Sequence, residues 1–153
     1  MAETTPFTAR VFYKDPRVAL AWLERAFGFE TSMVVADNDG SVIHAEMSFN
    51  GRGRLMIGSD SDELHRHSPL TTAGVNTQWV EVQIEADIDA HCERARAAGA
   101  VISLEPRTEF YGERIYDARD PEGHIWAFNQ LVQVVAYDDP VYKSIGLTVR
   151  DSL

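Results

Sequence analysis

The first sixty residues carry short hydrophobic patterns that switch from strand to helix and back. Residues 7–13 mix β-branched and aromatic side chains with rough alternation, which predicts a strand. Asp15 and Pro16 follow as an N-cap and a first helical residue, the next apolar residues recur at helical spacing, and Gly28 supplies a stop. Turn residues then separate three further runs that we expect to be strands, at 31–36, 42–49 and 53–59.

The same order of patterns begins again after a polar segment. Residues 60–78 are polar and aperiodic, which is typical of a linker. Residues 79–84 alternate as a strand, and Asp87 can cap a second helix that stops at Gly99. A strand at 101–104 and a final hairpin complete the second half.

The final hairpin surrounds Asp120-Pro121-Glu122-Gly123. Proline presets φ for a tight turn and glycine supplies the left-handed residue that closes a three-residue loop, so Asp120 faces His124. The pairing then continues as Ala118–Trp126, Asp117–Ala127 and Tyr116–Phe128. Alternation places the aromatic members on one face, which requires a helix to cover it, and places Asp117, Ile125, Ala127 and Asn129 on the other face, where a ligand fits.

The spacing of the two halves indicates an internal duplication. The helix-stopping Gly28 and Gly99 lie 71 positions apart, and the hairpin glycines Gly53 and Gly123 lie 70 apart. We therefore predict an α+β fold of two tandem βαβββ modules that form a curved mixed sheet around a central cavity, with helices outside. The expected divisions are a first module at 1–60, a linker at 61–78, a second module at 79–130 and an extension at 131–153. The extension serves as a dimer contact or as a lid, and the sequence favours neither.

Composition narrows the classes of partner. The net charge of −10 and the isoelectric point near 4.8 argue against nucleic acid and anionic membrane surfaces as partners. Cys92 stands alone, which excludes an internal disulfide and a cysteine-based metal cluster, and its helical position predicts a buried small hydrophobe. No apolar run of 18 residues and no signal-like segment is present, so we expect a cytoplasmic protein.

Five segments resemble the vicinal oxygen chelate superfamily, which includes glyoxalase I, bleomycin-resistance proteins and extradiol dioxygenases. The matching segments, in chain order, are Lys14-Asp15, Ala-Trp-Leu-Glu-Arg-Ala-Phe-Gly-Phe at 21–29, His-Ala-Glu at 44–46, Asp-Ile-Asp at 87–89 with Ala-Arg-Ala-Ala-Gly-Ala at 95–100, and Asp-Pro-Glu-Gly-His-Ile-Trp-Ala-Phe at 120–128. The resemblance implies paired modules around a U-shaped cavity and a homodimer. It does not imply one reaction, because fold and function are separable.

Members of the superfamily that use a metal hold a divalent ion on histidine and glutamate side chains in the cavity. By alignment, those positions fall on Thr8, Ile57, Trp79 and Ala127 in this chain. Tryptophan, isoleucine and alanine offer no lone pair for a metal, and threonine is a poor neutral ligand. We therefore expect no metal at the usual site and no cofactor.

Alternation within the strands predicts which side chains face the cavity and contact a small molecule. The ligand-binding residues expected on this ground are Arg10, Phe12, His44, Glu46, Ile57, Trp79, Glu81, Asp117 and Ala127. Tyr111 is added because it precedes the last hairpin, where an aromatic side chain can close the mouth of the cavity. Trp79 is suited to stack on a flat ring or a cation, although core packing explains a tryptophan equally well. The three acids Glu46, Glu81 and Asp117 suit a positively charged ligand, although a solvated strand face or an ion pair with arginine explains them too. His124, at the hairpin edge, is expected to have a structural role.

Three functions fit these residues. We favour a binding protein of the bleomycin-resistance kind, not an enzyme, which holds a hydrophobic or cationic aromatic molecule without a metal and acts by sequestration or as a carrier. The alternative is a metal-dependent lyase, isomerase or dioxygenase-like enzyme that uses an unusual site at His44, Glu46 and Glu81, since His-x-Glu on a strand places both side chains on one face. A structural or regulatory module would instead fill the cavity with its own side chains.

Overall fold

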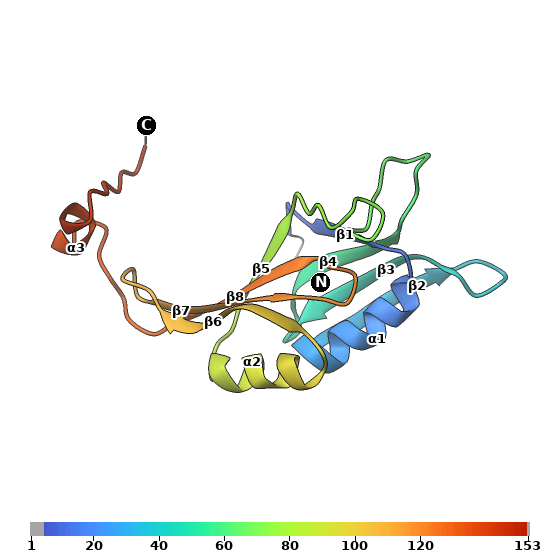
Figure 1. Ribbon diagram of the computed structural model, residues 1–153, viewed down its shortest axis with the longest axis horizontal. Coiled ribbons are helices and arrows are strands. Elements are labelled where there is room, and N and C mark those ends of the chain that lie inside the picture. The colour runs from blue at the N-terminus through green and yellow to red at the C-terminus, as the bar shows by residue number, and fades with distance from the viewer. Residues whose placement is uncertain (1–4, 153) are drawn as a thin grey trace.

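The computed structural model describes residues 5–152 (Figure 1). The first unit consists of β1 (Ala9–Tyr13), α1 (Pro16–Phe27), β2 (Phe29–Ala36), β3 (Val42–Phe49) and β4 (Arg52–Ser59). The second consists of β5 (Trp79–Gln83), α2 (Ile88–Ala97), β6 (Val101–Thr108), β7 (Glu113–Arg119) and β8 (Ile125–Leu131), and α3 (Pro140–Ser144) follows. This order confirms the predicted α+β class and the two repeated βαβββ modules.

Each module forms its own four-stranded mixed sheet with the same topology. The N-terminal sheet has the order β1-β4-β3-β2, and the C-terminal sheet has the order β5-β8-β7-β6. In each sheet the first strand of the module runs parallel to the last, and the remaining neighbours are antiparallel. The two sheets do not close into a barrel.

The helices begin and end at the residues that the sequence indicates. The Asp15 carboxylate accepts the Val18 N–H at 3.1 Å, and Gly28 ends α1 in a left-handed conformation with φ of 79°. The Asp87 carboxylate accepts the Ala90 N–H at 3.1 Å and so caps α2. Within residues 5–152, no helix has both the length and the apolar composition needed to cross a bilayer.

One core joins the two modules. As predicted, Tyr116, Trp126 and Phe128 are buried on one face of the C-terminal sheet, beneath helices. The ring of Phe27, at the end of α1, lies 5.5 Å from the ring of Trp126 and 4.8 Å from that of Phe128. Phe29 on β2 reaches the same tryptophan at 5.4 Å, so the helix-covered faces of the two sheets meet. Cys92 is buried in this core, as expected.

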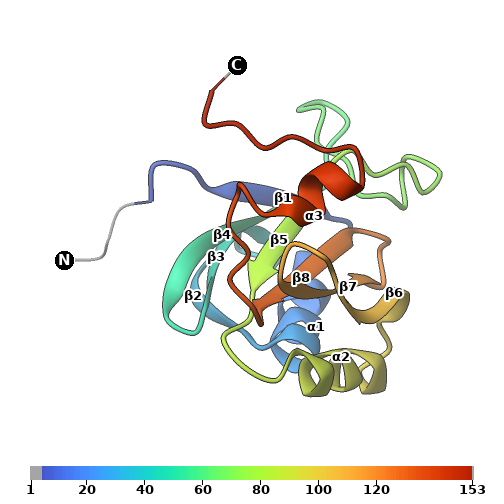
Figure 2. The ribbon, with the colours of Figure 1, turned by 90° about the vertical axis from the view of Figure 1, so that its left-hand side faces the viewer.

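Helix α2 also completes the end of α1. Arg94 donates from Nε to the Arg25 carbonyl and from a terminal nitrogen to the Glu24 carbonyl, both at 2.8 Å. His91 Nε2 lies 2.8 Å from the Phe27 carbonyl, and its Nδ1 lies 2.6 Å from the Tyr116 hydroxyl. Because the last carbonyls of a helix lack partners within the helix, these side chains fix the modules against each other. Figure 2 shows the two helices next to each other on one side of the molecule.

The predicted placement of Ile57 on a cavity face is wrong. Register pairs Ile57 with Val11 and Ala45, and its side chain is fully buried in the core. A two-residue turn at Asn50-Gly51 with uninterrupted pairing would place Ile57 opposite His44. The register instead shifts between Met47 and Phe49, and this β-bulge turns the following residues of β4 to the other face.

The extension beyond β8 leaves the body of the protein. Asp139 caps α3 by accepting the Val141 N–H at 2.9 Å. Figure 1 shows α3 and the following residues beyond the far end of the C-terminal sheet. Large apolar side chains on this extension are exposed, among them Val134 at 82% and Tyr137 at 70%. Its role as a dimer contact or a lid stays a prediction.

Candidate functional site

The face of the C-terminal sheet opposite the core carries four of the ten candidate residues: Trp79, Glu81, Asp117 and Ala127. Register places Glu81, Ala127 and Asp117 side by side across β5, β8 and β7. Two residues before Glu81 on β5, Trp79 lies beside Ile125. Two residues after Ala127 on β8, Asn129 lies between Gln83 on β5 and Ile115 on β7. We call this set, made of Trp79, Glu81, Asp117, Ala127 and Asn129, the acidic site. The alternation predicted for the final hairpin is confirmed here.

The acidic site combines an exposed ring with carboxylates on either side of a small residue. The Trp79 side chain is 58% exposed, whereas the other two tryptophans are buried. Glu81 accepts a hydrogen bond from the Asn129 amide. Burial raises the pKa of the Asp117 carboxyl, Arg107 opposes the rise and the negative Glu81 carboxylate adds to it. The Glu81 carboxylate therefore disfavours the charged form of Asp117, and a cation between the two side chains would relieve this.

Tyr111 lies at the margin of the acidic site, in the loop between β6 and β7. Partial burial raises the pKa of its hydroxyl, and the negative charges of Glu109, Glu113 and Glu81 raise it further. Arg107, the nearby cation, is paired with Glu109 through Nε at 2.5 Å. The Arg107 guanidinium is therefore already paired with the Glu109 carboxylate, and among the residues that the structure describes it leaves the carboxylates of the acidic site without a cationic partner of their own at this margin.

The candidates of the first module lie on the other sheet. Arg10, Phe12, His44 and Glu46 share the face of the N-terminal sheet that turns away from the core. Glu46 forms an ion pair with Arg54, and this contact lowers the pKa of the Glu46 carboxyl. His44 Nε2 lies 3.5 Å from the same carboxylate. The structure therefore separates the predicted cavity residues into two sets, and the Glu46 carboxylate already has a cationic partner.

The described residues do not fit a divalent metal. His44 and Glu46 belong to the N-terminal sheet and Glu81 to the C-terminal sheet, and within residues 5–152 no three His, Cys, Asp or Glu side chains gather in a group that could hold a metal ion. Trp79 and Ala127, at which the resemblance to the vicinal oxygen chelate superfamily leads us to expect metal ligands, offer no donor atom.

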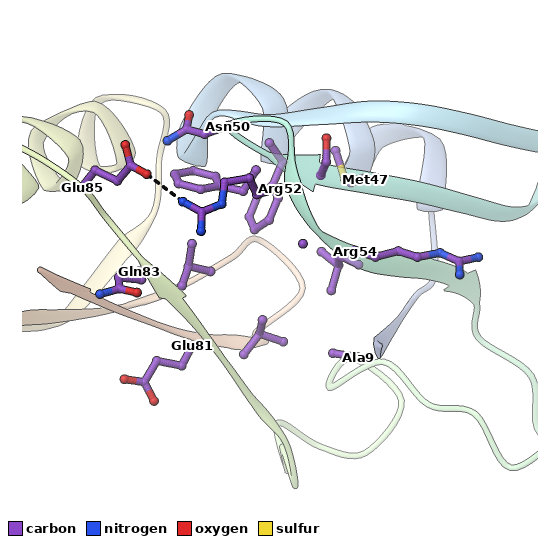
Figure 3. Close-up of a pocket in the computed structure, with 15 residues that line it drawn as sticks. Ala9, Met47, Asn50, Arg52, Arg54, Glu81, Gln83 and Glu85 are labelled. Carbon is purple, nitrogen blue, oxygen red and sulfur yellow. Dashed lines mark hydrogen bonds and ion pairs between the residues drawn. The ribbon is translucent and has the colours of Figure 1, made fainter. Parts of the chain in front are cut away.

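A groove of about 440 Å³ runs between the β3–β4 hairpin and β5 (Figure 3). Its floor is apolar and includes Phe29, Leu55 and Val82. An ion pair between Arg52 and Glu85, with 3.1 Å between nitrogen and oxygen, crosses one end. This volume suits a drug-sized molecule. Glu81 on β5 is among the residues around the groove, but its carboxylate points away from the groove, toward the acidic site (Figure 3). The groove and the acidic site therefore adjoin at β5.

A second cavity of about 300 Å³ lies under the linker and includes Arg10, Phe12 and His124 in its walls. The Arg66 guanidinium lies over the Phe12 ring, 5.5 Å from its centroid. Within this wall His124 is buried, donates from Nε2 to the Phe12 carbonyl at 2.8 Å and packs on the Tyr13 ring. The structural role expected of His124 is consistent with these contacts.

Sequence reasoning placed Asn129 on the correct face but did not select it as a site residue. Its Oδ1 is the one buried side-chain nitrogen or oxygen within residues 5–152 that lacks a hydrogen-bond partner. The signal in the sequence was its position two residues after Ala127 on the same strand.

Comparison with known proteins gives the family. The Glyoxalase/Bleomycin resistance protein/Dioxygenase superfamily matches residues 6–128. The crystal structure of TioX from Micromonospora sp. ML1 is 30% identical, covers 86% of this chain and 98% of its own, and superposes with a TM-score of 0.65. TnmS3, an antibiotic binding protein from Streptomyces sp. CB03234, shares the fold at 18% identity, with coverage of 86% and 98% and a TM-score of 0.63.

An uncharacterised protein of Mycobacterium tuberculosis is 28% identical over 126 residues, which are 82% of this chain and 74% of that protein. The superfamily match spans both modules, from before β1 to the middle of β8, in agreement with the repeated βαβββ topology. The chain belongs to the Glyoxalase/Bleomycin resistance protein/Dioxygenase superfamily.

Proposed function

We propose that this protein binds a small hydrophobic or cationic aromatic molecule without a metal ion, and that it acts by sequestration or as a carrier. The observation that carries the proposal is the acidic site, where Glu81 and Asp117 flank Ala127 and the exposed Trp79 lies one step along the sheet. A planar ring can stack on the tryptophan while a positive charge lies near the carboxylates.

The surroundings of the acidic site support a cationic ligand over an anionic one. Burial raises the pKa of the Asp117 carboxyl, so this group gains when a positive charge arrives. The nearby Arg107 is engaged by Glu109, and the whole chain carries a net charge of −10. A negative field of this kind raises the local concentration of cations and speeds their association.

The adjoining groove supports a ligand with an apolar body. Its floor is formed by core side chains at the seam between the modules, and its volume lies in the range of small-molecule sites. TnmS3, which has the same fold, is described as an antibiotic binding protein. An antibiotic with a cationic aromatic group is therefore the ligand class that we propose, and resistance by sequestration is the corresponding role.

A fluorescence titration tests the proposal. Trp22 and Trp126 are buried, so a ligand that quenches tryptophan emission from outside acts chiefly on Trp79. We expect bleomycin or an acridinium dye to quench saturably, and Trp79→Phe to remove most of the quenching. Glu81→Gln and Asp117→Asn should each raise Kd about fivefold, since a partly exposed charge pair contributes about 1 kcal/mol.

The matched control is Glu93→Gln, which removes the same charge from the exposed side of α2. We expect this variant to bind as the wild type does. Added salt should weaken binding by the wild type more than binding by Glu81→Gln, because charge pairs near the surface are screened. Equal weakening by Glu93→Gln and Glu81→Gln would show that only the overall charge matters, and would contradict a site at β5.

A further inference from the structure

Asn129 holds a buried acceptor without a donor. It lies on the central strand β8, where its backbone pairs with Ile115 on β7 and Gln83 on β5, and its carbonyl accepts the Ile84 N–H at 2.7 Å. The residue is only 9% exposed, yet Oδ1 has no hydrogen-bond partner. A buried polar atom of this kind destabilises the free protein, because it has lost its contact with water and gained nothing in return.

The orientation of this amide follows from its neighbour. The Asn129 nitrogen donates to the Glu81 carboxylate, which accepts hydrogen bonds and has none to give. Rotating the amide by 180° would set oxygen against oxygen, so the nitrogen faces Glu81 and Oδ1 is the atom left over. The unpaired group is therefore an acceptor, and what it lacks is an N–H or O–H donor.

We propose that the acidic site recognises a primary or secondary ammonium, or an amidinium, through two kinds of acceptor. The carboxylates of Glu81 and Asp117 pair with its positive charge, and Asn129 Oδ1 accepts a hydrogen bond from one of its N–H groups. This inference rests on the proposed function and names the ligand group that the site selects. An ammonium that pairs with Glu81 arrives beside the Asn129 amide, because these two side chains are already hydrogen-bonded. Oδ1 is buried in the free protein, so the amide has to turn toward the ligand for this atom to accept the N–H.

A quaternary ammonium lacks the N–H donor that this site can accept. It carries the same charge and is attracted by the same carboxylates, but it has no N–H for Oδ1 and leaves that acceptor unpaired. A site with an unpaired buried acceptor discriminates strongly against a ligand that lacks the matching donor. Charge alone would not discriminate between the two ligands.

A matched pair of probes tests this selection. Titration calorimetry is carried out with 1-naphthylmethylammonium and with its N,N,N-trimethyl analogue, which share ring and charge. We expect the wild type to bind the primary ammonium at least about tenfold more tightly, the equivalent of one hydrogen bond to a charged donor. In Asn129→Leu, which keeps most of the side-chain volume, the ratio should fall to about twofold or less, with the Kd of the trimethyl analogue unchanged.

Asn129→Ala is a second variant, in case leucine disturbs the sheet, and circular dichroism reports the folding of both. Equal affinity of the wild type for the two probes, with weaker binding of both by Glu81→Gln, would overturn the selection by Asn129 and leave the proposed function standing. A tenfold preference that survives in both Asn129 variants would also overturn it. Binding of neither probe by the folded wild type would contradict a cationic ligand and the selection together.

Discussion

Asp120, the first residue of the β7–β8 turn, accepts five hydrogen bonds and should be among the most costly residues to replace. Its Oδ1 accepts the N–H groups of Glu122, Gly123 and His124 at 2.9–3.0 Å. Its Oδ2 accepts the Tyr13 hydroxyl at 2.6 Å and the indole N–H of Trp126 at 3.0 Å. The side chain is 4% exposed, so water cannot replace these contacts.

We predict that Asp120→Ala lowers the free energy of unfolding by about 4–6 kcal/mol. Hydrogen bonds to a charged group contribute about 1.5–3 kcal/mol each, and each buried donor left unpaired costs about 1–3 kcal/mol. The Tyr13 hydroxyl and the Trp126 indole are both left in that state, whereas Gly123 N–H keeps its contact with the Asp120 carbonyl at 2.9 Å. A loss of this size approaches the whole stability of many domains.

Urea unfolding followed by circular dichroism and by tryptophan fluorescence measures the change, and coincident transitions justify a two-state analysis. Tyr13→Phe should cost about 1–2 kcal/mol in the wild type and much less in Asp120→Ala, because the shared hydrogen bond is already lost. Asp120→Asn should lie between wild type and alanine, since its oxygen still accepts the turn N–H groups. A loss below about 1.5 kcal/mol in Asp120→Ala would refute the reasoning that these contacts stabilise the turn.

Three further predictions concern the junction of the modules and the extension. Burial lowers the pKa of His91 below 6.5, so the folded protein favours the neutral imidazole. The free energy of unfolding should therefore fall as the pH drops below about 6.5. Urea unfolding at pH 7 and pH 5.5 measures this fall, and His91→Gln should reduce it. Arg94→Ala should lower the free energy of unfolding by about 1 kcal/mol, and Arg94→Lys should not restore it because lysine lacks the guanidinium fork. Gly112→Ala should release the extension to proteases, because φ is 94° and a Cβ would lie 1.9 Å from the Gln133 carbonyl oxygen; unchanged cleavage beyond β8 would contradict this.

The sequence predicts the fold well where local chemistry determines the geometry. The Asp-Pro-Glu-Gly turn fixes the loop length, and the pairs Asp117–Ala127 and Tyr116–Phe128 follow from it by counting. The caps at Asp15 and Gly28 are equally local. In these places the position of one residue determines its neighbours, and the predicted faces are confirmed.

The prediction for Ile57 fails because one extra residue in β4 reverses the side to which each later side chain points. The sequence does contain a signal, since Asn50-Gly51 is typical of a two-residue turn, and Gly53, with φ of 64°, follows where a bulge can form. The sequence alignment reaches Ile57 by counting four residues forward from Gly53, as Ala127 lies four residues after Gly123 in the last hairpin, and this count takes no account of the bulge. A single-residue error is enough, because the side-chain period of a strand is two.

The packing of the linker depends on contacts that no local pattern reveals. Residues 60–78 lack periodicity, yet Ser68 is fully buried and its hydroxyl donates to the Glu122 carboxylate at 2.5 Å. The same carboxylate accepts the backbone N–H groups of Lys14 at 2.7 Å and Asp15 at 3.0 Å. Glu122 reads from sequence as an ordinary turn residue, but it joins the start of α1, the linker and the last hairpin.

The two modules repeat one backbone plan, but their polar faces differ in how the charges are compensated, and this difference carries the functional proposal. On the N-terminal sheet the Glu46 carboxylate is paired with Arg54 and approached by His44, so a ligand would have to compete with existing partners. On the C-terminal sheet Asp117 has a raised pKa, and the Asn129 amide that satisfies Glu81 keeps an unpaired oxygen. A cation with N–H groups would remove both costs at once, whereas it would gain little on the N-terminal sheet. The acidic site is therefore where binding energy is available, and substitutions there should change affinity more than equivalent substitutions around Glu46.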